Sequence, residues 1–310
     1  MPRRLSPSEC VSLDFEVMIT VSSCPSCGEA ISRCRRALVS PFLARRIWKR
    51  DPFEIALMRC GTCGLFFFNP RLEPDEEARL YSGYRGAEYQ SLRQYFEPWY
   101  TQRFNASITS PEFLEVRKTK IREILQEFVS AKQTSRILDF GGAQGELVLN
   151  LIPGAESYVY DVSGVESLDG VSACADLEEC RNQNFDLILC SNVLEHLGSP
   201  RTAVEQMRQI ARPDTLLWVD VPHESPCGST LVGRRVLQTA LLSVTRPRVA
   251  LSLAKPGALY LMHEHVNFFG EQALRRTVAT AGWTVTQSGS YGLRGPLGRQ
   301  EWVWALARAA

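Results

Sequence analysis

Four short apolar runs recur through the middle of the chain: residues 137–138, 157–160, 185–190 and 215–222. The first two lead into an acid, Asp139 and Asp161 respectively. Residues 200–211 lie between the last two runs, and their apolar side chains recur every three to four positions. Short apolar runs that alternate with helical periodicity predict buried strands joined by helices. The pattern therefore predicts an α/β fold with a doubly wound parallel sheet.

A glycine-rich turn follows the first run. Gly141, Gly142 and Gly145 precede an apolar segment, residues 147–151, which is predicted to begin a helix. Glycine permits positive φ and lets a ligand approach the backbone closely. In doubly wound folds such a turn lies at the carboxyl end of a strand, where nucleotide-like ligands bind. A plain strand-to-helix turn is the alternative, but Asp161 ends the next strand and is placed to bind the hydroxyls of a ribose.

Together these segments resemble the class I S-adenosylmethionine (SAM) methyltransferases. Residues 138–145 resemble the first motif of that family, with Ala143 where a middle glycine is usual, and residues 185–196 resemble its fourth-strand motif. The resemblance covers roughly residues 113–309 and implies a seven-stranded, Rossmann-like sheet, SAM as cofactor and methyl transfer as the reaction. The side chains and backbone that it implies for SAM binding are Asp139, Gly141, Gly142, Gly145, Asp161, Asp176, Leu177, Cys190, Asn192 and His196.

Two C-x-x-C pairs lie nearer the N-terminus, and a glycine follows each pair. Four thiolates in two such turns form a closed tetrahedral zinc site, which stabilises a small domain. Glycine after the second cysteine lets the backbone turn around the metal. Disulfides or free thiols are the alternative, which a cytoplasmic location disfavours. We predict a structural zinc ion bound by Cys24, Cys27, Cys60 and Cys63.

The order of these motifs predicts the domain organisation: a loose tail at 1–17, a zinc ribbon at 18–75, a connecting or capping segment at 76–112 and a methyltransferase domain at 113–310. A cysteine-pair ribbon followed by an aromatic strand and Asn69-Pro70-Arg71 resembles sugar C-methyltransferases and enzymes of bacterial surface-glycan clusters. This likeness implies a sugar nucleotide or a glycan as methyl acceptor. Methylation of RNA, because the ribbon is basic, and a non-catalytic SAM-fold binding protein are the alternatives.

An insertion in the methyltransferase domain is predicted at residues 224–262, with one helix over 231–244. It holds five basic residues and one acid, Glu224, which gives a net charge of +4. That charge suits the phosphates of a sugar nucleotide. An ordinary helix whose arginines reach water, or a segment that contacts a membrane surface, would show the same pattern.

All four histidines of the chain lie after the predicted strand at 185–190 and no later than residue 265. Neutral imidazole is the natural general base near neutral pH. His263 and His265 are expected to point the same way from an extended segment, with Glu264 opposite. Residues 262–265 resemble a Tyr-His-Glu-His segment of the sugar C-methyltransferases, with Met262 in place of the tyrosine. We predict His265 as the general base and His263 or Glu264 as the group that orients it, with His223 and then His196 as the other candidates.

The overall composition limits the partners. The net charge is +1, from 35 basic and 34 acidic residues, which gives no general attraction to nucleic acid or to an anionic membrane. No apolar run approaches the ~18 residues that a membrane helix requires, and the N-terminus has no apolar signal core. We expect a cytoplasmic protein with a small-molecule or glycan substrate.

Overall fold

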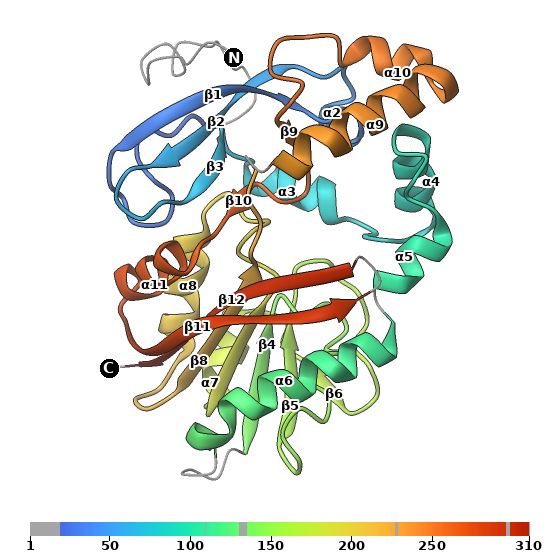
Figure 1. Ribbon diagram of the computed structural model, residues 1–310. Helices are drawn as coiled ribbons and strands as arrows, with labels where there is room; N and C mark the ends of the chain where they lie inside the picture. The colour runs from blue at the N-terminus through green and yellow to red at the C-terminus, as the bar shows by residue number, and fades with distance from the viewer. Residues whose placement is uncertain (1–18, 109, 130–134, 227–228, 296–297, 310) are drawn as a thin grey trace. The chain divides into compact units, whose positions relative to one another are not determined.

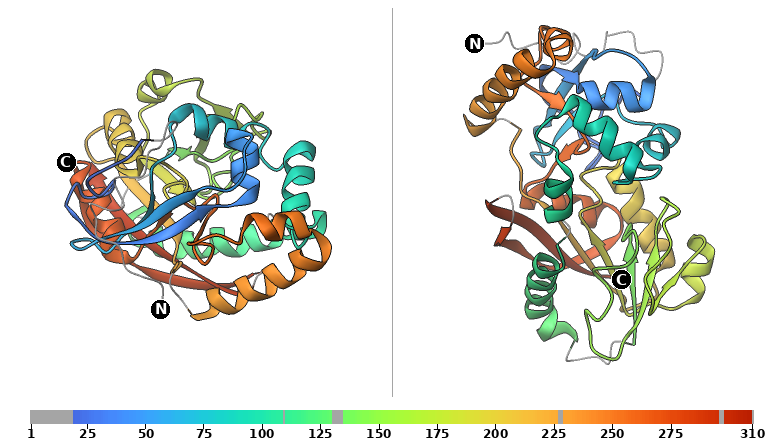
Figure 2. Two further views of the ribbon diagram at one scale, coloured as in Figure 1. Left: turned by 90° about the horizontal axis from the view of Figure 1, so that it is seen from above. Right: turned by 90° about the vertical axis from the view of Figure 1, so that its right-hand side faces the viewer.

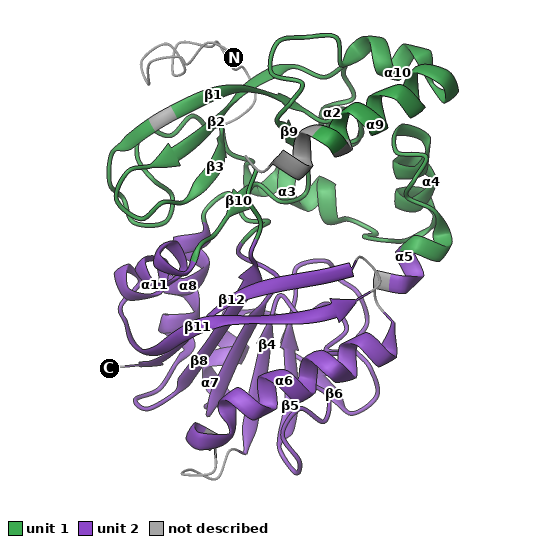
Figure 3. Cartoon of the chain, viewed as in Figure 1, with its two compact units in different colours: residues 1–104, 195–199, 224–270 green, residues 105–194, 200–223, 271–310 purple. Residues whose placement is uncertain are grey.

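The computed structural model describes residues 19–108, 110–129, 135–226, 229–295 and 298–309. They form two compact units, which Figure 3 distinguishes by colour. Unit 1 contains the chain up to Phe104, Glu195–Ser199 and Glu224–Gly270; unit 2 contains Asn105–Leu194, Pro200–His223 and Glu271–Ala310. Segment 224–262, expected as an insertion of the methyltransferase domain, therefore groups with the N-terminal part of the chain.

Unit 2 is built on a seven-stranded sheet with the strand order β11-β12-β8-β7-β4-β5-β6 (Figure 1). Neighbouring strands from β8 to β6 run parallel, and β12 and β11 close the sheet as an antiparallel hairpin. The predicted doubly wound, seven-stranded sheet is confirmed. The strands are β4 (Arg136–Phe140), β5 (Glu156–Tyr160), β6 (Val171–Ala173), β7 (Leu187–Ser191), β8 (Leu216–Pro222), β11 (Trp283–Gly295) and β12 (Gly298–Ala309).

Helices cover both faces of this sheet (Figures 1 and 2). The longest of them is α6 (Pro111–Val129), which buries Ile121 and Leu125 completely in a core that includes Trp218. On the other face lie α7 (Leu177–Asn182) and α8 (Pro200–Ile210), and α11 (Glu271–Thr280) packs against α8. Burial of the apolar stripes on these helices supplies the main stabilisation of the unit.

The strand order reverses at β4, since β5 and β6 lie on one side of it and β7 and β8 on the other. A doubly wound sheet binds its ligand at such a switch point, outside the carboxyl ends of the strands. Gly141 and Gly142 follow β4 there, and Asn192 follows β7. The structure thus places both segments that resemble methyltransferase motifs at this edge.

The predicted helix after the glycine turn is wrong. Residues 147–151 form consecutive turns, with isolated bonds such as Leu149 N–H to the Gly145 carbonyl, 3.1 Å, and Leu151 N–H to the Val148 carbonyl, 3.0 Å. Asn150 takes a left-handed conformation, φ 58°, which interrupts helical geometry. The apolar spacing instead serves burial, because Val148 and Leu151 are fully enclosed in the core.

Unit 1 is built on a five-stranded sheet with the order β10-β3-β2-β1-β9. Its first three strands form antiparallel pairs, β9 runs parallel to β1, and β10 runs antiparallel to β3. The two edge strands come from a segment about two hundred residues further along the chain, which explains why residues 224–270 belong to this unit. The strands are β1 (Ile31–Val39), β2 (Glu54–Cys60), β3 (Phe66–Asn69), β9 (Leu261–Met262) and β10 (Asn267–Phe268).

Short helices surround that sheet. Ser40 caps the first of them, since its hydroxyl accepts from the N–H of Leu43 at 3.3 Å. The predicted helix at 231–244 is confirmed and slightly longer, and it forms a hairpin with the helix that follows (Figure 1). No helix in the described part of the chain is long and apolar enough to cross a membrane. The helices are α2 (Pro41–Trp48), α3 (Pro74–Tyr81), α4 (Ala87–Phe96), α9 (Ser229–Thr245) and α10 (Pro247–Ser252), and the boundary between the two units falls within α5 (Gln102–Ile108).

Candidate active site and cysteine cluster

The turn after β4 needs its glycines. Gly141 and Gly145 have φ values of 76° and 81°, which side chains rarely allow. A Cβ on Gly142 would lie 2.3 Å from the carboxyl group of Asp139. Ala143 stands at φ 49° in the same turn, and this left-handed conformation costs a residue with a side chain roughly 1–2 kcal/mol. A Cβ on Gly141 would lie 2.7 Å from Val193 and one on Gly145 would lie 2.7 Å from Val171, so the close packing of these side chains against the turn requires glycine.

Asp161 is held by the same turn. Its Oδ2 accepts a hydrogen bond from the Ala143 N–H at 2.8 Å, and its Oδ1 accepts from the Ser163 N–H at 2.7 Å. Each carboxylate oxygen has a second lone pair. The half-buried carboxylate can therefore keep both backbone bonds and still accept from two hydroxyls, which fits a ribose.

Asp139 lies beneath the turn with only 2% of its surface exposed. Burial raises the pKa of its carboxyl group to about 7; the charge of Arg117 opposes the rise, and those of Asp161 and Asp220 add to it. Asp139 is thus an uncharged or easily protonated acid at neutral pH, which distinguishes it from a carboxylate that must stay charged to bind hydroxyl groups.

A buried polar network behind β7 was not predicted. Asp220 of β8 is fully enclosed, and its Oδ2 accepts from Arg117 Nη2 at 2.8 Å and from the Tyr291 hydroxyl at 2.5 Å. Its Oδ1 accepts from the hydroxyl of Ser191 at 2.6 Å. A lone acid within an apolar strand, as in residues 216–221, is the signal that could have revealed it.

This network fixes Asn192, one of the residues predicted to bind SAM. Its Oδ1 accepts from Arg117 Nη2 at 3.0 Å and from the Trp302 indole N–H at 2.9 Å. Asn192 itself takes a left-handed conformation, φ 56°, and its N–H binds the Asp220 carbonyl at 3.0 Å. Because both its backbone and side chain are held, the peptide after β7 is presented in a defined orientation.

Three other predicted SAM residues have structural roles of their own. Asp176 is exposed and caps α7, accepting from the Glu179 N–H at 2.8 Å. Leu177 is the half-buried first residue of that helix, and Cys190 is fully buried within β7. Contact of these residues with SAM stays a prediction.

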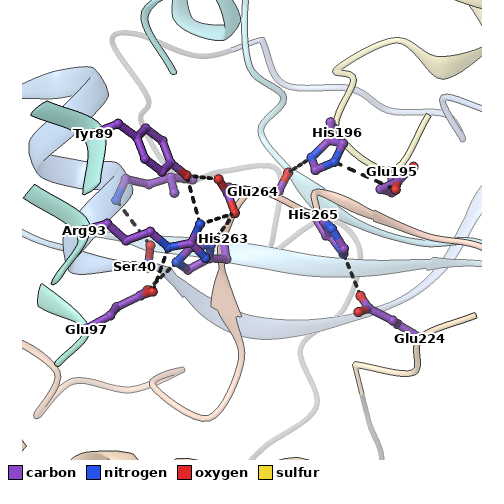
Figure 4. A network of polar contacts seen from close by, with 11 residues as sticks. Ser40, Tyr89, Arg93, Glu97, Glu195, His196, Glu224, His263, Glu264 and His265 are labelled. Atoms are coloured by element: carbon purple, nitrogen blue, oxygen red, sulfur yellow. Dashed lines mark hydrogen bonds and ion pairs between the residues drawn. The ribbon is translucent and has the colours of Figure 1, made fainter. Parts of the chain in front are cut away.

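The histidines separate into two groups. His196, His263 and His265, together with Glu264, lie in unit 1, where Figure 4 shows them in one polar network. His223 lies in unit 2 and is exposed, with its Nδ1 3.7 Å from Oε2 of Glu301. The chain enters unit 1 directly after β7 and again directly after β8, and these two segments supply His196 and Glu224 to the network.

His265 is paired with Glu224. Its Nδ1 lies 2.7 Å from Glu224 Oε2 (Figure 4). Burial disfavours a charged ring, but the carboxylates of Glu224, Glu195 and Glu264 outweigh it and raise the pKa of His265 to about 9. The ring is therefore held as an imidazolium at neutral pH in this conformation.

His196 has the opposite charge preference. Burial, followed by the charge of His265, lowers its pKa well below the usual value. Its Nδ1 lies 3.1 Å from the carbonyl of Glu264, which can only accept, so Nδ1 carries the proton and Nε2 carries the lone pair. The centroids of the His196 and His265 rings are 4.8 Å apart, so a neutral imidazole faces a charged one.

Glu195, His196 and His265 also bring one potential metal-ligand atom each to within 4.8 Å of one another. A metal ion needs the unprotonated nitrogen of each ring. Glu224 stabilises the proton on His265, so an ion here would compete with that proton. Proton exchange between the two rings and an acceptor is the chemistry that this charge pattern favours.

Glu264 and His263 join a second part of the network with Tyr89 and Arg93 of α4 and with Glu97, the C-cap residue of that helix, which follow one another at intervals of four. The Tyr89 hydroxyl donates to Glu264, and Arg93 Nη1 donates to the other oxygen of that carboxylate at 2.8 Å. Arg93 Nε donates to Glu97 at 3.0 Å, and Glu97 in turn binds His263 (Figure 4). Burial raises the pKa of Glu264 to about 7, against the charges of His265 and two arginines.

The expected alternation of these side chains is wrong. Nδ1 of His263 lies 3.7 Å from Oε2 of Glu264, whereas Nδ1 of His265 lies against Glu224. The reason is that β9 ends at Met262 and the chain bends at Glu264 before β10 begins, so the two-residue period of a strand does not apply.

Aromatic residues of α3 and the loop after it complete the surroundings of His196. The ring of Tyr81 contacts that of His196 edge-on, 5.7 Å between centroids, and Tyr84 links Tyr81 to the fully buried Tyr89. The Tyr81 hydroxyl is buried and has no hydrogen-bond partner among the described residues. A buried hydroxyl without a partner is costly, which makes it a natural contact for a polar ligand.

The four predicted zinc ligands converge. The Sγ atoms of Cys24 and Cys63 are 3.7 Å apart, those of Cys27 and Cys60 are 3.6 Å apart, and all four lie buried within 4.8 Å of one another. Tetrahedral zinc with ~2.3 Å bonds places sulfur atoms ~3.8 Å apart, so the cluster fits the ion. The glycines that end the two turns, residues 28 and 64, have φ values of 79° and 81°, a conformation that glycine allows at little cost.

Burial raises the pKa of Cys27 to about 11, which keeps this thiol protonated unless a cation stabilises the thiolate.

The parallel sheet, its switch point and the glycine turn with Asp161 define unit 2 as a class I methyltransferase fold. A family model described as a methyltransferase domain matches residues 113–288, more than half of the chain. The protein therefore belongs to this methyltransferase family and is a SAM-dependent methyltransferase.

Several solved structures resemble the chain. The 1,6-didemethyltoxoflavin N1-methyltransferase of Burkholderia thailandensis is 15% identical, with 83% of this chain and 96% of that one covered and a TM-score of 0.47. The N-methyltransferase NodS of Bradyrhizobium japonicum, solved with S-adenosylhomocysteine, is 18% identical, with 65% and 89% covered and a TM-score of 0.38. The comparison with curated proteins gives no match. None of these likenesses indicates the methyl acceptor.

Proposed function

We propose that the protein methylates an oxygen or carbon of a sugar, in a sugar nucleotide or a glycan, with His265 as the general base. The observation that carries this proposal is the pair formed by His265 and Glu224, 2.7 Å apart, beside the neutral ring of His196. Methyl transfer to a hydroxyl or an activated carbon requires removal of a proton, and a histidine oriented by a carboxylate is suited to accept it.

Unit 2 offers the residues that would hold SAM, which supplies an electrophilic methyl group when bound. Gly141, Gly142 and Gly145 form the turn at the carboxyl end of β4, and Asp161 retains lone pairs for the ribose hydroxyls. Asn192 is fixed at the carboxyl end of β7 by Arg117 and Trp302. The remaining predicted contacts, Asp139, Asp176, Leu177, Cys190 and His196, belong to the same proposal.

His265, as the base, would accept one proton from the methyl acceptor. Nδ1–H of His265 stays hydrogen-bonded to Glu224, and Nε2 of the neutral ring takes the proton of the acceptor. The imidazolium that results is stabilised by the Glu224 carboxylate, as is usual for a histidine that is oriented by an acid. Arg93 and Glu97 hold Glu264 and His263 in place beside it, which supports a positioning role for these two residues. His223 and His196 are the alternative bases.

A sugar fits the polar character of this network. The hydroxyl of Tyr81 and Nε2 of His196 are groups that can bind the hydroxyls of such an acceptor. The ribbon and the His263-Glu264-His265 sequence, which resemble the sugar methyltransferases, point to the same class. In the cysteine cluster we propose one zinc ion with a structural role, since four thiolates leave it no open position.

A screen with labelled SAM tests the proposal. Sugar nucleotides, lipid-linked glycans and RNA are supplied in turn, with His265→Ala as the inactive control. Methyl transfer to a sugar, reduced about 10²–10⁴-fold in the variant with SAM binding retained, is the expected result. Transfer only to RNA, with a steep dependence on salt, would establish the nucleic-acid alternative instead.

A further inference from the structure

The outer face of α9 is apolar and unpartnered. Val236, Leu237, Leu241 and Val244 are 66%, 72%, 41% and 84% exposed. At 100° per residue these four positions lie within an arc of roughly 140° on the helix. Leu251 of α10 is 74% exposed as well. The two helices form a hairpin at the periphery of unit 1 (Figures 1 and 2).

The hairpin is attached to unit 1 through its other face. Leu242 is 2% exposed and packs with Leu38, Val249 and Leu253. Burial of this inner cluster accounts for the folding of the hairpin, so the outer apolar side chains are not needed to hold it in place. Apolar residues on two faces of one helix indicate that the outer face has a separate use.

These side chains form a patch rather than a scatter. Ten large apolar side chains are exposed in the described part of the chain, and five of them lie on α9 and α10. A sixth, Tyr95, lies beside the hairpin, with the guanidinium of Arg246 5.3 Å from its ring centroid. Contiguous exposed apolar surface of this kind marks an interaction site.

The charge around the patch has one sign. Residues 225–262 contain four arginines, one lysine and no acid, although the whole chain has a net charge of only +1. Arg246 and Arg248 are exposed at the end of α9 and the start of α10. A second copy of this face would bring the same arginines together, which disfavours a dimer.

We infer that the α9–α10 hairpin docks on an anionic membrane surface. A helix with an apolar stripe, flanking arginines and an adjacent tyrosine is built to lie in the interface between lipid headgroups and acyl chains. The arginines contact anionic headgroups while the valine and leucine side chains enter the acyl boundary. Together with the proposed function, on which this last step rests, the docking surface selects a lipid-linked glycan as the acceptor.

Flotation with vesicles tests the docking. The full chain, without SAM or acceptor, is mixed with vesicles of phosphatidylcholine alone or with phosphatidylglycerol added. We expect binding to the anionic vesicles that high salt weakens. The combined change Leu237→Glu, Leu241→Glu and Val244→Glu should lower the partition coefficient at least about 100-fold. Val162→Glu in unit 2, at a position 81% exposed, is the matched control and should bind as the wild type does.

A second measurement guards against a variant that misfolds. Leu251→Trp keeps an apolar side chain, and the emission that it adds to that of the six native tryptophans, taken as the difference from the wild type, should shift to the blue on vesicles and be quenched by brominated lipid. Wild-type protein that stays out of all vesicles, or a triple variant that still floats, would overturn the inference. A wild-type dimer that the triple variant dissociates, without vesicle binding, would assign the face to a second copy.

Failure of docking and failure of the proposed reaction are distinguishable. Vesicle binding needs neither SAM nor a sugar, so its loss leaves methyl transfer to a water-soluble sugar nucleotide unaffected. If the acceptor is lipid-linked, the triple variant should methylate it slowly in vesicles while its affinity for SAM stays that of the wild type.

Discussion

Nδ1 of His265 lies 2.7 Å from Oε2 of Glu224, and this contact sets the charge of the imidazole. The neighbouring ring of His196, 4.8 Å away between centroids, has its Nε2 3.8 Å from Oε1 of Glu195, and burial, the largest influence on its pKa, keeps it neutral. Two histidines in one network therefore have pKa values on opposite sides of neutrality. Such a separation is how a single site can hold a proton donor and a proton acceptor at the same pH.

The contact between His265 and Glu224 predicts how turnover depends on pH. A base must be unprotonated, and the pKa of His265 is about 9, so its neutral fraction rises about tenfold per pH unit up to that value. Turnover should therefore increase from pH 7 to about pH 9 and then level off. Glu224→Gln removes the charge that raises the pKa, so the inflection should move to lower pH in rate profiles measured with saturating SAM.

The control for that profile is Glu301→Gln, which removes the carboxylate beside His223 instead. It should leave the inflection unchanged. A profile that shifts with Glu301→Gln and not with Glu224→Gln would transfer the role of base to His223.

His265→Ala and His223→Ala form a second test. Loss of a positioned base reduces turnover by about 10²–10⁴, so His265→Ala should do so while the Kd for SAM stays nearly constant. His223 is exposed, and its substitution should change turnover little. Near-normal turnover of His265→Ala would exclude it as the base.

Asp161→Ala should weaken SAM binding by roughly 1–3 kcal/mol, since charge-assisted hydrogen bonds to the ribose are lost. Calorimetry with S-adenosylhomocysteine measures the change. Asp161→Asn is the companion variant: its amide oxygen can keep one of the two backbone bonds, its NH2 faces the other N–H donor, at Ala143 or Ser163, and the charge is lost. Affinity equal to that of the wild type in both variants would remove Asp161 from the cofactor site.

The cysteine cluster predicts one zinc ion per chain in protein purified without added metal, which elemental analysis can count. Cys60→Ser should lose the metal and lower the melting temperature, because zinc binding contributes to folding. Cys174→Ser, which changes a cysteine outside the cluster, should keep one zinc per chain. A metal-free wild type of full stability would contradict the prediction.

Breaking the buried ion pair between Arg117 and Asp220 is predicted to destabilise the fold strongly. Arg117→Met leaves the Asp220 carboxylate buried without its ion pair, which typically costs about 3–5 kcal/mol in the free energy of unfolding. Adding Asp220→Asn should restore part of that loss, because the unpaired charge is gone. Urea denaturation of the single and double variants measures this, and equal destabilisation of both would show that charge burial is not the cause.

The sequence determined the elements that depend on local pattern. The parallel strands and the helices predicted at 200–211 and 231–244 follow from local sequence pattern, and the structure has all of them. The convergence of Cys24, Cys27, Cys60 and Cys63 also follows from the sequence, because each turn carries its own glycine and a closed metal site needs four ligands. These features are encoded over a few residues each.

The tertiary structure decided whatever depends on distant partners. Apolar spacing at 147–151 predicted a helix, but burial against the sheet is satisfied by turns, and Asn150 interrupts the geometry. The i, i+2 spacing of His263 and His265 predicted one direction for both rings, but the chain bends between them. Local patterns cannot predict a bend whose stabilising contacts, with Arg93 and Glu224, come from elsewhere in the chain.

The charges of the candidate base belong to that second group. The sequence shows that His265 exists and that histidine can titrate near neutrality, but its partner Glu224 is 41 positions away and follows a different strand. A pKa depends on burial and on the charges that folding brings within a few ångströms. The sequence by itself therefore determined the class of enzyme, while only the fold decided which imidazole is charged and which is neutral.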